Sequence, residues 1–388
     1  MSADTPSRLE RLRGYLQKDS GNLHLLADTA NAAFEEGDYA GAEALLNSYE
    51  TFAPLPAGLA SLKGLVALSR GNYSAAEFIF RDVRRQTSDT PALRFNLAWA
   101  LAMQDSYGDA LELLDDETLA ASPRAPALKI HALHHLARYE DAETCGKVLA
   151  ELFPRDEELM GALATLALDM AKSDLARGYA QRAGQSAEGR AALGLLALGD
   201  HDATGSLDLF EQVIATEPGN PRAWIGKGLS LLASGDTRSG AEAIDRGAAL
   251  FGDHVGSWIA SGWAHFVDGK NSRARESFER AMEIDPNFSE CHGGFAVMDI
   301  LDGNLEEAKR RTDIALRLDK NCFGGALARS ILLDKSGHAH LAQKVRDMAF
   351  AAPIGPNGRT IAGELVAFGF RPRQPGRTMG GAIPKRRP

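Results

Sequence analysis

The sequence predicts an all-α solenoid of about ten helix hairpins, and three observations support this fold class. A period of 34 residues runs through most of the chain. Small residues recur at two fixed places in each period, and a glycine followed by Asp or Asn separates the two halves of several periods. Because one hairpin cannot bury its apolar face alone, tandem hairpins are expected to stack into a continuous core.

Two series of residues spaced 34 apart set the frame of the repeats. The first is Leu23, Ala57 and Pro91, and the second is Ala187, Pro221, Val255, Ser289 and Phe323. Between the series, the frame continues if the repeat at Pro91 has 32 residues and the repeat at Glu157 has 30, which starts a further repeat at Pro123. This gives ten repeats over residues 23–356, eight of them of full length.

Small residues recur at positions 8 and 20 of the repeats, counted from the first residue of each. Position 8 holds Ala30, Gly64, Ala98, Gly194, Gly228, Gly262 and Ala296, and position 20 holds Ala42, Ala76, Ala110, Ser206, Gly240, Ala274, Ala308 and Ala342. Small residues at fixed spacing let two helices approach closely, so each repeat is interpreted as a packed helix pair.

A short turn joins the two predicted helices within a repeat, as at Gly37-Asp38-Tyr39 and Gly235-Asp236-Thr237. Gly closes the first helix and the following Asp or Asn begins the second. In the repeat at Val255, a helix over Val255–Val267 is expected to end at Gly269, with Ser272 as the N-cap of the next helix.

The two ends differ from the repeats. Residues 1–22 are interpreted as a half-repeat cap, and residues 357–370 as a closing helix. Residues 371–388 carry six basic and no acidic residues, and a disordered tail is expected. Subtracting these six from the 43 basic residues leaves 37 against 52 acidic, a charge of −15 on the rest of the chain.

Composition argues against several classes of protein. No apolar run reaches the roughly 18 residues that span a bilayer, and no signal-peptide stretch opens the chain. Three cysteines, an odd and small number, favour a reducing compartment, and the cytoplasm is expected. Outside the ten repeats too little chain remains for a catalytic domain, so neither an enzyme nor a cofactor is expected. The net charge of −15 disfavours nucleic acid as a partner.

The repeat at Val255 places large and small residues in a family-specific pattern. The residues are Trp258, Gly262, Ala274, Phe278, Ala281 and Pro286. Together with the period, this pattern resembles the tetratricopeptide repeat family. The resemblance implies a right-handed superhelix that acts as a scaffold and binds partner proteins in a concave groove, which the first helix of each repeat lines.

The groove positions that the resemblance implies are unusually apolar in this sequence. The partner-binding residues predicted from them are Leu65, Leu68, Phe95, Trp99, Met103, His131, His135, Leu195, Ile225, Leu229, Ile259, Trp263, Phe266, Val297 and Ile300. They suit an apolar or amphipathic segment of another protein, as in a chaperone or an assembly factor of a bacterial multiprotein system. Two alternatives remain: the same side chains pack between helices, or the chain self-associates through its groove or ends.

Two other kinds of site fit the residues less well. A clamp for an acidic carboxyl-terminal peptide needs lysines where this chain has Ala27, Ser61 and Phe95. His131 and His135 are spaced to share a metal ion, but no third ligand is evident nearby, so a polar groove wall is the preferred interpretation and no metal is expected.

Overall fold

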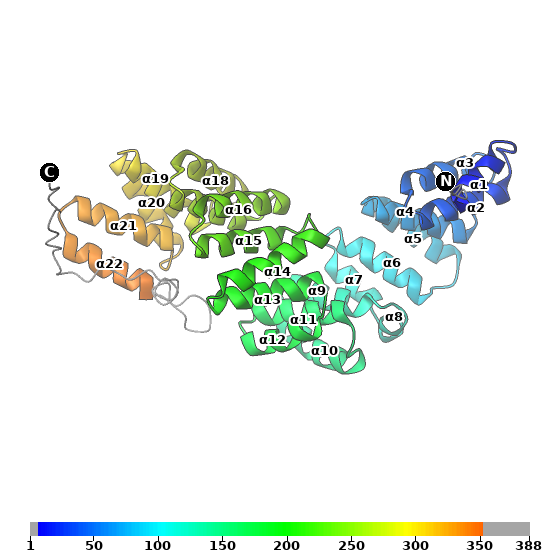
Figure 1. The fold of residues 1–388 in the computed structure, drawn as a ribbon, viewed down its shortest axis with the longest axis horizontal. Coiled ribbons are helices and arrows are strands. Elements are labelled where there is room, and N and C mark those ends of the chain that lie inside the picture. Colours follow the sequence, from blue (N-terminus) through cyan, green and yellow to red (C-terminus); the bar gives the residue numbers. More distant parts are fainter. Residues whose placement is uncertain (1–6, 352–388) are drawn as a thin grey trace, which may run out of the picture. The chain divides into compact units, whose positions relative to one another are not determined.

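The computed structural model describes residues 7–351 of the chain (Figure 1). In this range the chain forms helices α1 to α22 and no β-strand. The all-α class expected from the sequence is therefore confirmed. The predicted closing helix at 357–370 and the predicted basic tail at 371–388 lie outside the described residues.

The chain divides into two compact bodies, residues 1–166 and 167–388, and the boundary falls inside α11. The first body contains α1 (Arg8–Leu16), α2 (Leu23–Glu35), α3 (Tyr39–Glu50), α4 (Ala57–Ser69), α5 (Tyr73–Gln86), α6 (Pro91–Ala102), α7 (Tyr107–Leu113), α8 (Asp116–Ala121), α9 (Ala125–His135), α10 (Tyr139–Leu152) and most of α11 (Glu157–Asp169).

The second body continues the array of hairpins. It contains α12 (Ser173–Arg182), α13 (Ala187–Gly199), α14 (Ala203–Thr216), α15 (Pro221–Ala233), α16 (Thr237–Phe251), α17 (Val255–Val267), α18 (Asn271–Ile284), α19 (Ser289–Leu301), α20 (Leu305–Leu318), α21 (Phe323–Lys335) and α22 (Ala339–Ala351). Successive helices pack as pairs, and first helices also touch first helices, as α17 touches α19 and α19 touches α21.

Two fully buried aromatic rings of the second helices each lie between two glycines. Phe210 of α14 and Phe278 of α18 are fully buried. Phe278 lies against Gly262 in its own repeat and Gly294 in the next, where added Cβ atoms would come within 2.4 and 2.6 Å of the ring. The small residue predicted at position 8 therefore leaves room for the aromatic ring at position 24 of the same repeat.

The turns follow the predicted pattern at both ends of the array but not in its middle. Gly37 and Gly235 have positive φ, and the side chains of Asp38 and Asp236 cap the helices that follow. Position 15 of the middle repeats instead holds non-glycine residues with φ of 55–65°: Asp105, Ala137, Ala171 and His201. The expected cap at Ser272 is wrong, because the N-cap of α18 is Lys270, two residues earlier, and the helix begins at Asn271.

The third repeat departs from the hairpin pattern because its second helix is broken. The chain leaves α7 at Leu114, and the Asp115 side chain accepts a hydrogen bond from the Thr118 N–H at 2.9 Å to begin α8. Lys129 Nζ donates to the Leu114 carbonyl, which the break frees, at 3.0 Å. The next first helix, α9, begins at Ala125 instead of the expected Pro123, since residues 122–125 form a turn.

Candidate binding surfaces

In the first body, the predicted groove residues form an apolar stripe along α6. Phe95, Trp99 and Met103 follow at intervals of four residues, which places them on one face. The Phe95 and Trp99 ring centroids are 6.0 Å apart, and the Arg124 guanidinium carbon lies 4.2 Å from the Trp99 centroid. Phe95 and Trp99 are half-buried, and Met103 is 40% exposed. Solvent therefore reaches aromatic and thioether groups along this stripe.

Ion pairs tie α6 to the start of α8. The Arg94 guanidinium lies 2.7 Å from the Asp115 carboxylate and also pairs with Glu117. Hydrogen bonds from the Thr118 main chain and side chain, together with Arg94, lower the pKa of Asp115. Arg94 is thus held by two carboxylates, which fixes the first turn of the helix that carries the stripe.

The remaining predicted residues of the first body lie on α4 and α9. Leu65 and Leu68 are half-buried, as is His131, whereas His135 is exposed. The His135 ring stacks on Tyr107, with 4.4 Å between centroids and 2° between planes. Burial and the hydrogen bond to Asp105 raise the pKa of Tyr107 to about 12. The stack joins α9 to α7.

In the second body, three predicted residues on α13 and α15 are at least partly open. Leu195 is 40% exposed. Ile225 and Leu229 are half-buried and pack against the core cluster of Ala241, Ile244 and Ala264. These side chains combine a packing role with some open surface.

Trp263 is the centre of an aromatic cluster. Its ring meets Phe266, Phe278 and Phe323 edge to face, with centroid distances of 5.7, 5.3 and 5.7 Å. Trp263 and Phe266 both pack against the core of α17–α21 and are half-buried. A substitution of Trp263 would therefore remove core packing as well as surface.

Three predicted groove residues lie in the core. Ile259, Val297 and Ile300 are 8%, 1% and 3% exposed. All three belong to one cluster around α19, a helix that touches α17, α18, α20 and α21. A partner cannot contact these side chains in this conformation. For these three residues, the structure agrees with the alternative that the side chains pack between helices.

A buried polar network joins α16, α17 and α18. Ser261 Oγ donates to Asp245 Oδ1 at 2.5 Å and shares a hydrogen bond of 2.7 Å with Ser277 Oγ. His265 Nε2 lies 2.7 Å from Asp245 Oδ2. Because Ser261 and His265 both bond to the carboxylate and not to each other, this is not the nucleophile–base arrangement of a hydrolase. Among the described residues, no three His, Cys, Asp or Glu side chains are grouped to hold a metal ion.

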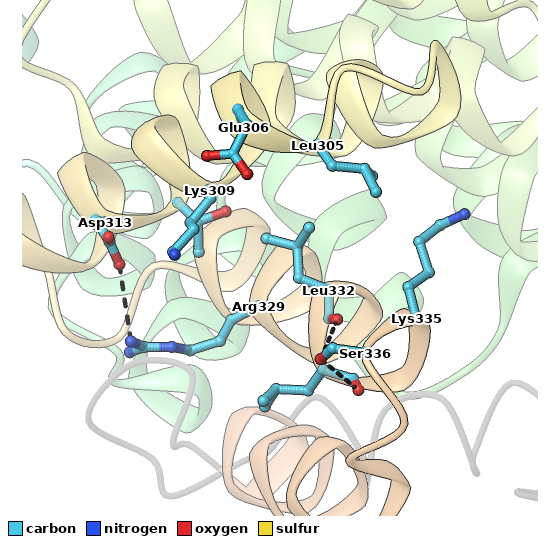
Figure 2. A pocket seen from close by; sticks show the side chains of 10 residues that line it. Leu305, Glu306, Lys309, Asp313, Arg329, Leu332, Lys335 and Ser336 are labelled. Carbon is cyan, nitrogen blue, oxygen red and sulfur yellow. Dashed lines mark hydrogen bonds and ion pairs between the residues drawn. The ribbon is translucent and has the colours of Figure 1, made fainter.

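A pocket of about 390 Å³ lies between α20 and α21 (Figure 2). Leu305 and Leu332 contribute apolar walls, and Asp313 and Arg329 face each other across it with 3.7 Å between their charged atoms. Glu306, Lys309 and Lys335 add charges of both signs. Because the lining combines apolar side chains with charges of both signs, it does not indicate one class of ligand.

A larger cleft of about 700 Å³ lies between α8, α9 and α10, and we call it the α8–α10 cleft. Its apolar lining comprises Leu119, Ala120, Leu133, Cys145, Val148, Leu149, Leu152 and Phe153; its polar lining is Asp116, Lys129, Arg138, Asp141 and Thr144. Sequence reasoning missed it, because the broken helix was not expected. The available signal was Asp115-Asp116-Glu117, an acidic run typical of a helix start inside a segment interpreted as one helix.

The comparisons with known proteins agree with this architecture. A family model described as tetratricopeptide repeat matches residues 61–126, 191–236 and 225–287. The chain is a helical-repeat protein. More narrowly, the matched residues have the pattern of tetratricopeptide repeats, as the resemblance in the sequence predicted.

The solved structures that are similar to this chain are distant in sequence. A monomeric mutant of IFIT1 with Gppp-AAAA is 11% identical with a TM-score of 0.54, covering 87% of this chain and 93% of that one. The Cut9–Hcn1 hetero-tetramer of the APC/C is 14% identical with a TM-score of 0.48, covering 89% and 87%. MamA is 14% identical with a TM-score of 0.35, covering 43% and 91%. No curated protein matches the sequence.

Within the described residues, none of the helices combines the length and apolar character needed to cross a membrane.

Proposed function

We propose that the chain is a non-enzymatic scaffold that binds an apolar or amphipathic segment of a partner protein through open apolar side chains on its first helices. The observation that carries the proposal is the α6 stripe. Phe95 and Trp99 are half-buried, Met103 is 40% exposed, and Arg124 packs over the indole. Aromatic side chains and Arg dominate the binding energy of protein interfaces, so this composition suits a partner contact.

Open apolar side chains on other first helices support the same proposal. Leu195 is exposed on α13, and Ile225 and Leu229 are half-buried on α15. The buried residues Ile259, Val297 and Ile300 are left out of the proposed contact. Holding an apolar segment is the task of a chaperone or assembly factor of a bacterial multiprotein system, and we propose this role. The free thiols Cys145, Cys291 and Cys322 suit the reducing cytoplasm.

Site-specific photo-crosslinking tests the proposal in the full chain. A photoreactive amino acid at position 103 or 195 is expected to capture a discrete partner. The same amino acid at position 78 is the control, because Phe78 is 71% exposed but lies on the second helix α5. The double change Phe95→Ser and Trp99→Ser should abolish capture at position 103. Equal capture at position 78 would refute the proposed contact.

Light scattering separates partner binding from self-association. A mass that stays at one chain across concentrations favours capture of a different protein. A concentration-dependent mass that the double change at Phe95 and Trp99 abolishes would instead assign the stripe to contacts between copies of this chain.

A further inference from the structure

The α8–α10 cleft exists because the second helix of the third repeat is broken. Most other repeats carry a second helix of 10–15 residues, whereas here seven residues form α7 and six form α8. The short α8 lies against α9, and its Leu119 and Ala120 form one wall of a space of about 700 Å³. That volume lies in the range of small-molecule sites, roughly 300–1,000 Å³.

The opposite wall is one face of α10. Cys145, Val148, Leu149 and Leu152 recur at intervals of three and four residues, which places them on a single stripe. Val148 and Leu152 are 55% and 65% exposed, and Leu149 is buried beneath them. Together with Leu133 of α9, they make a wall that is mostly aliphatic and open to solvent.

One cation within this apolar lining forms no direct ion pair with a described residue, although its charge helps to lower the pKa of Asp115. Lys129 is half-buried, and its ammonium donates to the Leu114 carbonyl at 3.0 Å. No carboxylate among the described residues lies within 4.0 Å of it. Arg138 and Asp141 pair with each other at 2.7 Å, and Asp116 lies in the first turn of α8, where the helix dipole favours an acidic residue.

These features select the chemistry of an occupant. An ammonium has three donors, and the Leu114 carbonyl uses one of them. A purely apolar occupant would remove water from the Lys129 ammonium without supplying new hydrogen bonds, and burying a charge in this way costs free energy. A carboxylate would supply charge-assisted hydrogen bonds to the ammonium, while an aliphatic chain attached to it would cover the exposed Val148 and Leu152.

We propose that the α8–α10 cleft binds an aliphatic monocarboxylate, with its carboxylate on Lys129 and its chain between α8 and α10. Lys129 and Leu133 lie on the first helix α9, but the rest of the lining follows the first helices, and no residue of the cleft is among those proposed to contact the partner protein. The site is therefore separate from the one proposed for the partner protein, and either can fail without the other.

Cys145 provides a local readout, because it lines the cleft and is half-buried while Cys291 and Cys322 are buried elsewhere. The probe is dodecanoate below its micelle concentration, added to the full chain, and the rate of iodoacetamide alkylation is measured at each thiol by mass spectrometry. We expect saturating dodecanoate to slow alkylation of Cys145 by about tenfold and to leave the two buried thiols unchanged. Dodecan-1-ol, which has the same chain without the charge, should protect Cys145 far less.

Variants of Lys129 test the charge directly. Lys129→Met should weaken dodecanoate binding by about tenfold or more, the scale of a lost charge-assisted hydrogen bond. Lys129→Arg keeps the cation and should retain binding, which separates charge from folding. Lys147→Met is the matched control, since Lys147 lies on α10 but outside the cleft and is 61% exposed. Equal protection by dodecan-1-ol, full binding by Lys129→Met, or no protection of Cys145 would each overturn the proposal.

Discussion

At the residue scale, the spacing of small residues reflects the shape of individual side chains. An added Cβ on Gly226 would come within 2.2 Å of the Phe210 ring, and one on Gly194 within 2.9 Å. Protein interiors are close-packed, so a ring seated between two helices leaves no room for another methyl group. In the first repeat, position 24 holds a smaller side chain, Leu46, and position 8 holds alanine, Ala30.

Gly262→Ala is therefore expected to destabilise the protein by about 1–3 kcal/mol, because the new methyl would overlap the fully buried Phe278 ring. The matched control is Gly178→Ala in α12, where nothing lies within 4 Å of an added Cβ. This control should gain about 0.5–1 kcal/mol from helix propensity. Urea unfolding of both variants checks the pair, and a loss of equal size in both would contradict the packing argument.

A half-buried carboxyl group at the contact of α19 with α21 gives a pH-dependent stability. Glu290 accepts hydrogen bonds from the Gly324 N–H at 3.1 and 3.2 Å. Burial raises its pKa above its usual value near 4.5, against the opposing effect of these hydrogen bonds, and Asp319 adds to the rise. The folded state then binds more protons than the unfolded state just above that usual value, so this group's contribution to stability falls as pH rises there.

The variant Glu290→Gln should lack this decline. The difference in unfolding free energy between wild type and variant is expected to shift in favour of the variant as pH rises from about 4 to 8. Urea unfolding at several pH values measures that difference. A shift in favour of the wild type would mean that the hydrogen bonds from Gly324 outweigh burial.

At the element scale, the predicted frame located nine of the ten first helices, and only the one expected at Pro123 begins elsewhere, at Ala125. Helices begin at Leu23, Ala57 and Phe323, where the 34-residue frame placed them. In the middle repeats, position 15 carries no glycine, so the Gly-Asp or Gly-Asn signal that marks a turn is missing although the turn itself is formed. The period also slips there, and the break between α7 and α8 went unrecognised.

The candidate sites were less predictable than the helices, because exposure depends on how neighbouring helices pack. Met103 and Val297 occupy related first-helix positions and are both apolar, yet one is 40% exposed and the other 1%. The sequence of a first helix alone does not indicate which of its faces a neighbouring helix covers. The α8–α10 cleft depends on a helix break and was missed for the same reason.

Replacing a strained turn residue by glycine should stabilise the array. Ala171 has φ 55°, in the left-handed region that costs a non-glycine residue about 1–2 kcal/mol. Ala171→Gly is expected to gain about 0.5–1 kcal/mol, since the greater freedom of glycine in the unfolded chain offsets part of the relief. Gly71→Ala, at the equivalent turn with φ 74°, should lose about 1 kcal/mol. Thermal melting measures both, and a loss in Ala171→Gly would show that no strain is relieved.

At the scale of the whole molecule, stability is distributed along an array of neighbour contacts. Helices touch partners that are adjacent or next but one in the chain, with few exceptions such as the contact of α6 with α9. Two compact bodies result, with their boundary in α11. In such arrays, stability is close to a sum of repeat and interface contributions, and a single cooperative transition is not guaranteed.

The tryptophans allow the two bodies to be followed separately during unfolding. Trp99 is the only tryptophan of the first body, while Trp224, Trp258 and Trp263 belong to the second. Trp99→Phe therefore reports on the second body alone, and replacing the other three by Phe reports on the first. We expect the fluorescence midpoints in urea to differ between the two proteins, because contacts between neighbouring repeats alone couple distant helices weakly. Circular dichroism of each variant provides the control, since its transition should include both steps. Coincident midpoints by both probes would mean that the chain unfolds as one cooperative body, and the division at α11 would then carry no thermodynamic meaning.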